Sequence, residues 1–215
     1  MKKILAIGGA VMKTEARQYL WEVADDIEML LLNGGALFHD FQMALEGYTS
    51  VPLDELNESM ERIEFSCMTV CRYVSYNVKP PQNSFVAEMR KRAIPVLLFT
   101  APGCDYWQKF LIDWSRLGKK IETDFMRLQT RLRFNKFHFI NMCSAVIMPE
   151  VFQKAIQGIS KDYIRADVVD FLEMYRPRTR VARYGEYYQM DVVEYMKKWS
   201  KEVISNGSSD SSSID

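Results

Sequence analysis

An apolar run that stops at Asn33-Gly34-Gly35 constrains the fold more than any other feature of this chain. The four apolar residues Met29–Leu32 suit a strand that is covered on both faces, as in a parallel sheet. Two glycines after such a strand let the main chain turn sharply and lie close to a ligand. A helical pattern follows at once and carries His39 and Asp40 near its start. The stretch therefore predicts a strand, a glycine turn and a helix.

Other short apolar runs alternate with helical patterns along the chain. The sequence predicts strands over Lys3–Ile7, Ile27–Leu32, Ile94–Phe99, Lys136–Asn141 and Ala166–Met174. Such alternation indicates an α/β fold with a doubly wound, mostly parallel sheet. We expect one domain over residues 1–204, because a chain of this length can bury a substantial core. The Ser/Asp/Gly-rich residues 205–215 have almost nothing to bury, so we expect a disordered tail there.

Helical periodicity and capping residues place the helices between these strands. The expected helices run from a Thr14 cap to about Asp26, from His39 to Glu46 with a stop at Gly47, from Pro52 to about Val78, from an Asn83 cap to Arg92, from Tyr106 to Phe134 with a break near Gly118, within Ser144–Gln157, and from an Asp191 cap to Val203.

Composition excludes several classes of protein. Lys+Arg and Asp+Glu number 28 each, so there is no strong overall signal for nucleic-acid binding. No apolar run reaches the roughly 18 residues that a membrane span needs, and the short apolar start after Lys2-Lys3 suits a strand better than a signal peptide. The four cysteines form no CxxC pair, which favours free thiols and a cytoplasmic location. With only two histidines, a transition-metal site is not expected.

Polar and glycine residues gather where the predicted strands end. In open α/β sheets, ligands bind outside the carboxyl ends of the strands, where main-chain N–H groups can hold a phosphate or carboxylate. The candidates for binding a cofactor are Gly8, Gly9, Asn33, Gly34, Gly35, Thr100, Asp105 and Ser144. Their spacing matches neither GxGxxG nor GxxxxGK[ST]. Tight turns without a ligand explain such glycines equally well.

His39 and Asp40 are the candidate catalytic groups, because they follow the double glycine directly. The imidazole could act there as an acid, a base or a donor that positions a ligand. A helix-start histidine with a capping Asp40 explains the same residues, and the sequence leaves both interpretations open. His138 alternates within a strand, which favours a structural histidine.

Three further groups have structural explanations that compete with a functional one. Asp124 falls within a helical pattern and suits a solvated or capping acid. The arginines between Arg176 and Arg183 could clamp a phosphate, although a solvated loop or a subunit contact is the better explanation. The stripe of Trp107, Phe110 and Trp114 suits a core or an interface.

Several segments resemble the deoxyhypusine synthase-like family, and in particular its shorter prokaryotic members. The likeness lies in Ile7–Thr14, Asn33–Ser50, Asn141–Ala155 and Tyr175–Arg178, and it extends along most of residues 3–185. It implies a Rossmann-like fold that binds NAD, assembly into a homo-oligomer, typically a tetramer, and transfer of an aminobutyl group from spermidine to a protein lysine through an imine on an active-site lysine.

The chain departs from that family at the catalytic lysine. The family pattern Glu-Ala-Val-Ser-Trp-Gly-Lys is absent, and Lys197, Lys198 and Lys201 do not match it. The Gly-Gly-Gly after the late strand is also missing.

Two hypotheses for the function follow. One is an enzyme that binds NAD or a related nucleotide, with a polyamine or similar small molecule, and either transfers an alkylamine group or carries out a nicotinamide-linked oxidation. The other is a catalytically inactive homo-oligomer that kept the fold and works by protein contact.

Overall fold

Six parallel strands form a single sheet in the order β3-β2-β1-β4-β5-β6. The computed structural model describes residues 2–47, 60–111 and 113–209 of the chain. The strands are β1 Lys3–Ile7, β2 Ile27–Asn33, β3 Val96–Phe99, β4 Phe137–Met142, β5 Ile164–Asp170 and β6 Tyr187–Gln189. This is the order of dinucleotide-binding Rossmann folds, and it reverses between β1 and β4. The predicted α/β fold with a doubly wound parallel sheet is confirmed.

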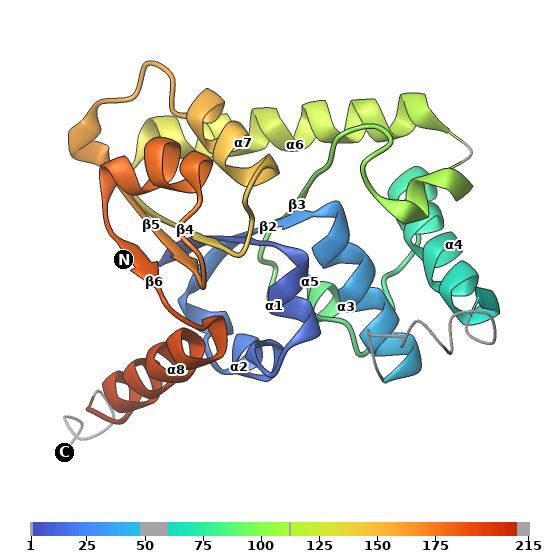
Figure 1. The fold of residues 1–215 in the computed structure, drawn as a ribbon, viewed down its shortest axis with the longest axis horizontal. Coiled ribbons are helices and arrows are strands. Elements are labelled where there is room, and N and C mark those ends of the chain that lie inside the picture. Colours follow the sequence, from blue (N-terminus) through green and yellow to red (C-terminus); the bar gives the residue numbers. More distant parts are fainter. Residues whose placement is uncertain (1, 48–59, 112, 210–215) are drawn as a thin grey trace.

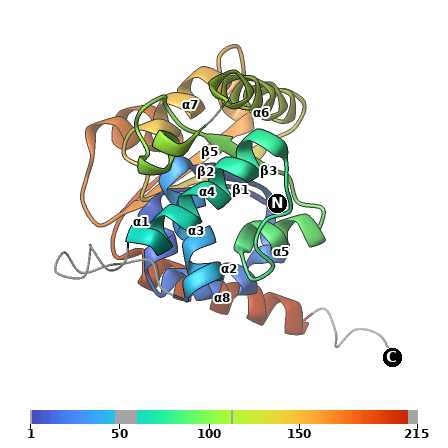
Figure 2. The ribbon, with the colours of Figure 1, turned by 90° about the vertical axis from the view of Figure 1, so that its right-hand side faces the viewer.

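Helices cover both faces of the sheet. The α-helices are α1 Gly9–Lys13, α2 Ala16–Glu22, α3 Gly34–Glu46, α4 Met60–Tyr76, α5 Phe85–Lys91, α6 Trp114–Phe134, α7 Ile147–Ala155 and α8 Val192–Ser209. Short helical turns occupy η1 Ala24–Asp26, η3 Tyr106–Phe110, η4 Lys161–Tyr163, η5 Pro177–Val181 and η6 Ala182–Tyr184. α6 and α7 lie on one side of the sheet, and α1, α2, α3 and α8 lie on the other (Figures 1 and 2). None of the described helices is long and apolar enough to cross a membrane.

Alternation along each strand divides the core into two layers. Leu5 and Ile7 of β1 pack with the side that carries α1, α2, α3 and α8. Ile4 and Ala6 pack with Leu128 and other residues of α6 and α7. Successive side chains of a strand point to opposite faces, so a strand that is apolar throughout can serve both layers.

The Asn33-Gly34-Gly35 turn is also the first turn of α3. The Asn33 side chain accepts a hydrogen bond from the N–H of Ala36 at 2.7 Å and caps the helix. α3 therefore begins five residues before the predicted start at His39. It ends as predicted at Gly47, whose φ of +79° suits a residue without a side chain.

Several predicted boundaries were wrong for local reasons. The single helix expected from Thr14 is divided, and the Thr14 hydroxyl donates back to Val11 O at the end of α1. Ser84 rather than Asn83 caps α5, through a bond from Ala87 N. α6 continues through Gly118, and the break comes earlier, before the Asp113 cap.

The edges of the fold also differ from the prediction. β5 ends at Asp170 rather than at Met174, and the three-residue strand β6 was not predicted, because it is too short to show alternation. α8 continues to Ser209, beyond the expected end at Val203. Residues 210–215, the end of the predicted tail, lie outside the described residues. So do residues 48–59, where the helix beginning at Pro52 was expected. The division into one domain and a tail stays a prediction.

Candidate functional site

The loops after β1 and β4 meet where the strand order reverses. Gly8 N–H donates to Met142 O at 2.8 Å. A Cβ at Gly8 would lie 1.9 Å from the carbonyl oxygen of Cys143 and 3.2 Å from Ser144 N. The two loops therefore touch through their main chains, and only glycine allows this approach. Gly8 and Ser144, which are far apart in sequence, lie together as predicted.

The loop after β2 adds the next part of this edge. A Cβ at Gly9 would lie 3.1 Å from Cδ2 of His39 and 3.5 Å from the carbonyl carbon of Gly35. α3 thus begins beside the start of α1, and its first turn brings N–H groups and partial positive charge to the edge. We call this edge, from Gly8 and Ser144 across to Asp105, the carboxyl rim.

The loop after β3 closes the carboxyl rim from the other side. A Cβ at Gly34 would lie 1.9 Å from Oδ2 of Asp105, so the carboxyl group packs on the Gly34 main chain. Thr100 donates a hydrogen bond to Asp105, and Trp107 Nε1–H donates to Gly34 O at 3.2 Å. Burial raises the pKa of Asp105 and outweighs the bond from Thr100, which lowers it. All eight cofactor-binding candidates lie along this rim; their binding role stays a prediction.

His39 stands at the carboxyl rim as a neutral imidazole. Burial, reinforced by the charge of Lys13, lowers the pKa of His39 from 6.5 to about 4. Its Nδ1 is buried and has no hydrogen-bond partner in the described part of the chain. A neutral ring can donate from one nitrogen and accept at the other. The geometry therefore suits a group that positions a ligand better than one that carries positive charge.

Asp40 points into the protein instead. Its side chain is fully buried, and its oxygens accept from Phe85 N at 2.8 Å, Val86 N at 3.0 Å and Arg17 at 3.0 Å. Burial raises the pKa of Asp40 despite these bonds, which lower it. The carboxyl group ties α3 to the start of α5. This anchoring accounts for Asp40 without any contact to a ligand, and no observation supports the predicted catalytic role.

The other polar candidates are engaged within the fold. Asp124 was expected to be solvated or a helix cap, but its side chain is 1% exposed and accepts from Leu98 N of β3 at 2.9 Å. Arg176 and Arg180 pair with Glu150 at 3.4 and 3.0 Å. The arginine loop is thus held by carboxylates of its own chain. Of the predicted aromatic stripe, Trp107 is 1% exposed and belongs to the core, whereas Trp114 is 46% exposed. The core prediction is therefore confirmed for Trp107 and not for the whole stripe.

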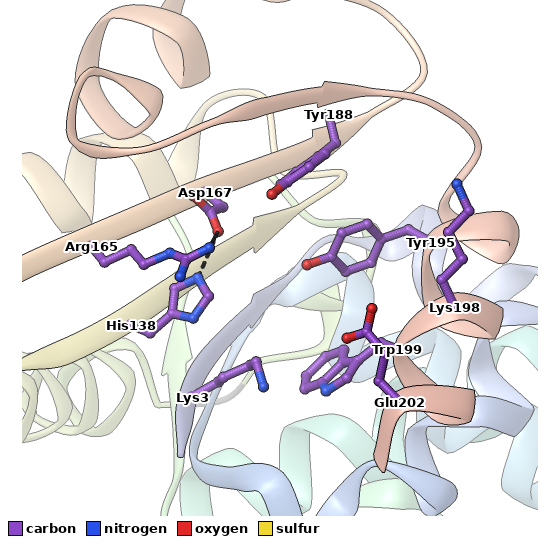
Figure 3. A pocket seen from close by; sticks show the side chains of 9 residues that line it. All are labelled: Lys3, His138, Arg165, Asp167, Tyr188, Tyr195, Lys198, Trp199 and Glu202. Atoms are coloured by element: carbon purple, nitrogen blue, oxygen red, sulfur yellow. Dashed lines mark hydrogen bonds and ion pairs between the residues drawn. The ribbon is translucent and has the colours of Figure 1, made fainter. Parts of the chain in front are cut away.

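A second candidate site lies between the sheet and α8, near the amino ends of β1, β4 and β5. It is a cavity of about 500 Å³ lined by Lys3, His138, Arg165, Asp167, Tyr188, Tyr195, Lys198, Trp199 and Glu202. In Figure 3 the hydroxyl groups of Tyr188 and Tyr195 point into the same space as the guanidinium group of Arg165. The strands contribute charged and polar side chains together with Tyr188, and α8 contributes two aromatic and two charged side chains.

A His–Asp pair forms the inner wall of this cavity. His138 Nε2 lies 2.7 Å from Asp167 Oδ2, and Asp167 Oδ1 accepts from Glu186 N at 2.9 Å. Burial would raise the pKa of Asp167, but the bonds from His138 and Glu186 N–H lower it below its ordinary value. His138 is buried and hydrogen-bonded, consistent with the structural histidine that the sequence favours.

Sequence reasoning missed this cavity. The sequence feature that could have indicated the cavity is a polar residue on the core-facing side of several buried strands, near the start of each strand. Lys3, His138 and Asp167 precede Leu5, Ile140 and Val169, which lie two residues later on the same faces of β1, β4 and β5. Apolar residues are the rule at such positions, so three polar exceptions on neighbouring strands indicate a polar hollow.

No three His, Cys, Asp or Glu side chains are grouped for a metal ion within residues 2–47, 60–111 and 113–209. The four cysteines are free thiols, as the spacing predicts. Burial raises the pKa of Cys143 to about 12, with smaller contributions from nearby carboxylates, so its thiol is protonated beside the carboxyl rim.

Comparisons with known proteins find likeness in structure only. No protein-family model matches the sequence. No curated protein matches it significantly. A conserved LOR/SDH protein from Methanococcus maripaludis S2 superposes on 96% of the chain with a TM-score of 0.65 and 16% identity. AgrE, solved in a ternary complex with ornithine and NAD+, superposes on 95% with a TM-score of 0.64 and 11% identity. ArgZ, an arginine dihydrolase from the ornithine-ammonia cycle in cyanobacteria, gives 0.62 over 96% at 15% identity.

The resemblance to the deoxyhypusine synthase-like family was therefore wrong. The matched structures are LOR/SDH-like, AgrE and ArgZ proteins. The predicted transfer of an alkylamine group depended on the resemblance and is wrong with it. Short glycine-rich segments follow strands in many Rossmann-like proteins that are otherwise unrelated. They indicate the fold, and they were wrongly interpreted as evidence of one family. The chain spans 63% of the LOR/SDH protein and 30% of AgrE, and identities this low establish the fold alone.

Proposed function

We propose that the carboxyl rim binds a dinucleotide of the NAD type. The observation that carries the proposal is the meeting of the loops after β1, β2, β3 and β4 at the point where the strand order reverses. Dinucleotides bind at this point in folds with this strand order, with a phosphate near a helix amino terminus. AgrE, which has a similar fold, was solved with NAD+.

Asp105 supports NAD rather than NADP. In dinucleotide-binding folds an acidic side chain near the end of the second strand accepts from the ribose 2′-hydroxyl. Here β2 ends in Asn33, whose side chain caps α3, and Asp105 brings a carboxyl group to the adjacent Gly34 from the next loop. A carboxylate at this place would accept from a free hydroxyl and repel a 2′-phosphate.

Titration calorimetry of the whole chain with NAD+, NADH and NADP+ tests the proposal. We expect saturable binding of NAD+ or NADH, with NADP+ weaker by about tenfold or more, since each 1.4 kcal/mol is one factor of ten. Binding of no dinucleotide to the folded chain would overturn the proposal, and a preference for NADP+ would remove the role given to Asp105.

Two variants locate the site. Gly9→Val would place a branched side chain against His39 and Gly35 and should abolish binding. Asp105→Asn should lessen the preference for NAD+ over NADP+. Asp113→Asn is the matched control, because Asp113 is partly exposed and its side chain caps α6 and pairs with Arg116. The homo-oligomer, the tetramer and the cytoplasmic location stay predictions, and the polyamine ligand rested on the family resemblance.

A further inference from the structure

Two adjoining hollows form one groove beside α6, at the β3 edge of the sheet. Their volumes are about 460 and 370 Å³, and they share Tyr73, Asn77, Lys120 and Arg127. Met29 and Val96, near the starts of β2 and β3, line the inner end. We call this the basic groove; α4, α5 and the first half of α6 supply most of its remaining lining.

The basic groove concentrates positive charge in a chain whose charges otherwise balance. It is lined by five cationic side chains, Arg90, Arg116, Lys119, Lys120 and Arg127, and by one carboxylate, Asp124. The whole chain has 28 cationic and 28 anionic side chains. A concave surface of one sign focuses the electrostatic field and attracts ions of the opposite charge. An excess of four positive charges makes a multiply charged anion the natural ligand.

Asp124 is the one carboxylate among the lining residues, and it pairs with two of the five cations, Lys120 and Arg127. Its side chain is 1% exposed, and Oδ2 is bonded to both Leu98 N and Lys120 at 2.9 Å. Arg127 lies 3.8 Å from the same carboxylate and is 63% exposed, which leaves its guanidinium group open to solvent. Lys119 has no ion-pair partner among the described residues.

Arg90 is held by neutral groups, whereas Arg116 contacts both a main-chain carbonyl and a carboxylate. Arg90 donates to Asn77 Oδ1 at 3.2 Å and stacks 4.9 Å from the centre of the Tyr73 ring. Arg116 donates to the carbonyl oxygen of Ser75 at 2.8 Å and is otherwise paired with Asp113 at the surface. Such contacts fix the orientation of Arg90 without cancelling its charge, as a prepared anion site requires.

We propose that the basic groove binds a small molecule carrying two or more linked phosphate groups. Guanidinium forks and lysine ammonium groups are the side chains that bind phosphate oxygens best. The groove cations of α6 stand at positions 116, 119, 120 and 127, a spacing that puts them on one face of the helix. Beyond Arg127 the next cation of α6, Arg131, is paired with Glu28 at 2.6 Å. This favours a small molecule over a nucleic-acid strand, which needs an extended basic track.

Calorimetry with tripolyphosphate, orthophosphate and a single-stranded RNA oligonucleotide tests the proposal on the whole chain. We expect tripolyphosphate to bind saturably and to weaken with added salt, with orthophosphate weaker by about tenfold or more. No saturable binding of tripolyphosphate at low salt would overturn the proposal. Tighter binding of the oligonucleotide, rising with its length, would overturn it in favour of a nucleic-acid surface.

A matched pair of double variants separates the groove from general charge. Lys119→Gln with Arg127→Gln removes two exposed groove cations, and Arg133→Gln with Lys136→Gln removes two exposed cations outside the groove. The first pair should weaken tripolyphosphate binding by about tenfold or more, and the second by less than about twofold. Equal losses would overturn the proposal. Gly9→Val should leave tripolyphosphate binding unchanged, so failure of the dinucleotide site and failure of this one are distinguishable.

Discussion

Gly8 and Cys143 lie so close across the reversal in strand order that a Cβ at Gly8 would stand 1.9 Å from the Cys143 carbonyl oxygen. The obstacle is main chain and cannot rotate aside. Cys143 itself has a φ of +52°, and its N–H donates to Val169 O of β5 at 3.0 Å. The loop after β4 is thus fixed from β5 and pressed against Gly8, and this contact sets the floor of the proposed dinucleotide site.

Gly8→Ala should therefore destabilise the protein by about 3 kcal/mol, because overpacking against a fixed backbone forces the two loops apart. Urea unfolding followed by circular dichroism measures the change. Gly118→Ala is the control: no atom lies within 4 Å of a Cβ there, and alanine in the middle of α6 should stabilise by about 0.5–1 kcal/mol. A Gly8→Ala protein as stable as the parent would show that the loops do not touch.

His39 should make the protein less stable as the pH falls from 7 towards 4. Its pKa is about 4 in the folded chain and about 6.5 when unfolded, so the unfolded state binds the extra proton first. The stability that depends on the neutral ring is complete above pH 6.5 and is lost between these values, by at most about 3 kcal/mol.

Replacing His39 by Gln should flatten this pH dependence. The measurement is the free energy of unfolding in urea at several pH values for both proteins. The control is His138→Gln, which removes the other histidine at a site away from the rim. If His39→Gln kept the full slope between pH 6.5 and 4, the buried neutral imidazole would not be its source.

Sequence reasoning located the rim because the relevant signals are local. An apolar run followed by glycine marks the end of a buried strand, and parallel strands present their carboxyl ends at the same edge. That argument alone predicted that Gly8, Gly34 and Asp105 lie at the same edge of the sheet, but it did not predict the distances between them. Helix ends were less well predicted where a cap depends on one neighbour, as at Ser84, or where a helix passes through Gly118.

Partners distant in sequence could not be predicted. Asp40 follows His39 directly, yet it faces α5 because successive residues of a helix point in directions about 100° apart. Its partners, Phe85 N and Val86 N, lie on another helix. The basic groove escaped notice for the same reason: Arg90 and Arg127 belong to separate helices, and overall neutrality hides a local excess of charge.

Asp40→Asn should destabilise the protein by about 2–4 kcal/mol, because it removes one partner of a buried ion pair and sets an amide N–H against a main-chain donor. Hydrogen exchange at the amides of Phe85 and Val86 should quicken most, since both donate to this carboxyl group. Asp25→Asn is the control, because the Asp25 carboxylate is 84% exposed and should contribute less than about 1 kcal/mol. Unchanged exchange at both amides would contradict the anchoring role.

Asp167→Asn should cost about 1–3 kcal/mol at pH 7, because the buried carboxylate accepts from both His138 and Glu186 N–H. The folded state lowers the pKa of Asp167, so its contribution is present above the unfolded value near 4 and is lost as the pH falls further. The difference in unfolding free energy between the two proteins should therefore shrink below pH 4. Arg165→Gln is the control, since Arg165 is 58% exposed and lies 3.4 Å from the same carboxylate. A difference that stayed constant from pH 7 to 3 would mean that the charge of Asp167 does not stabilise the fold.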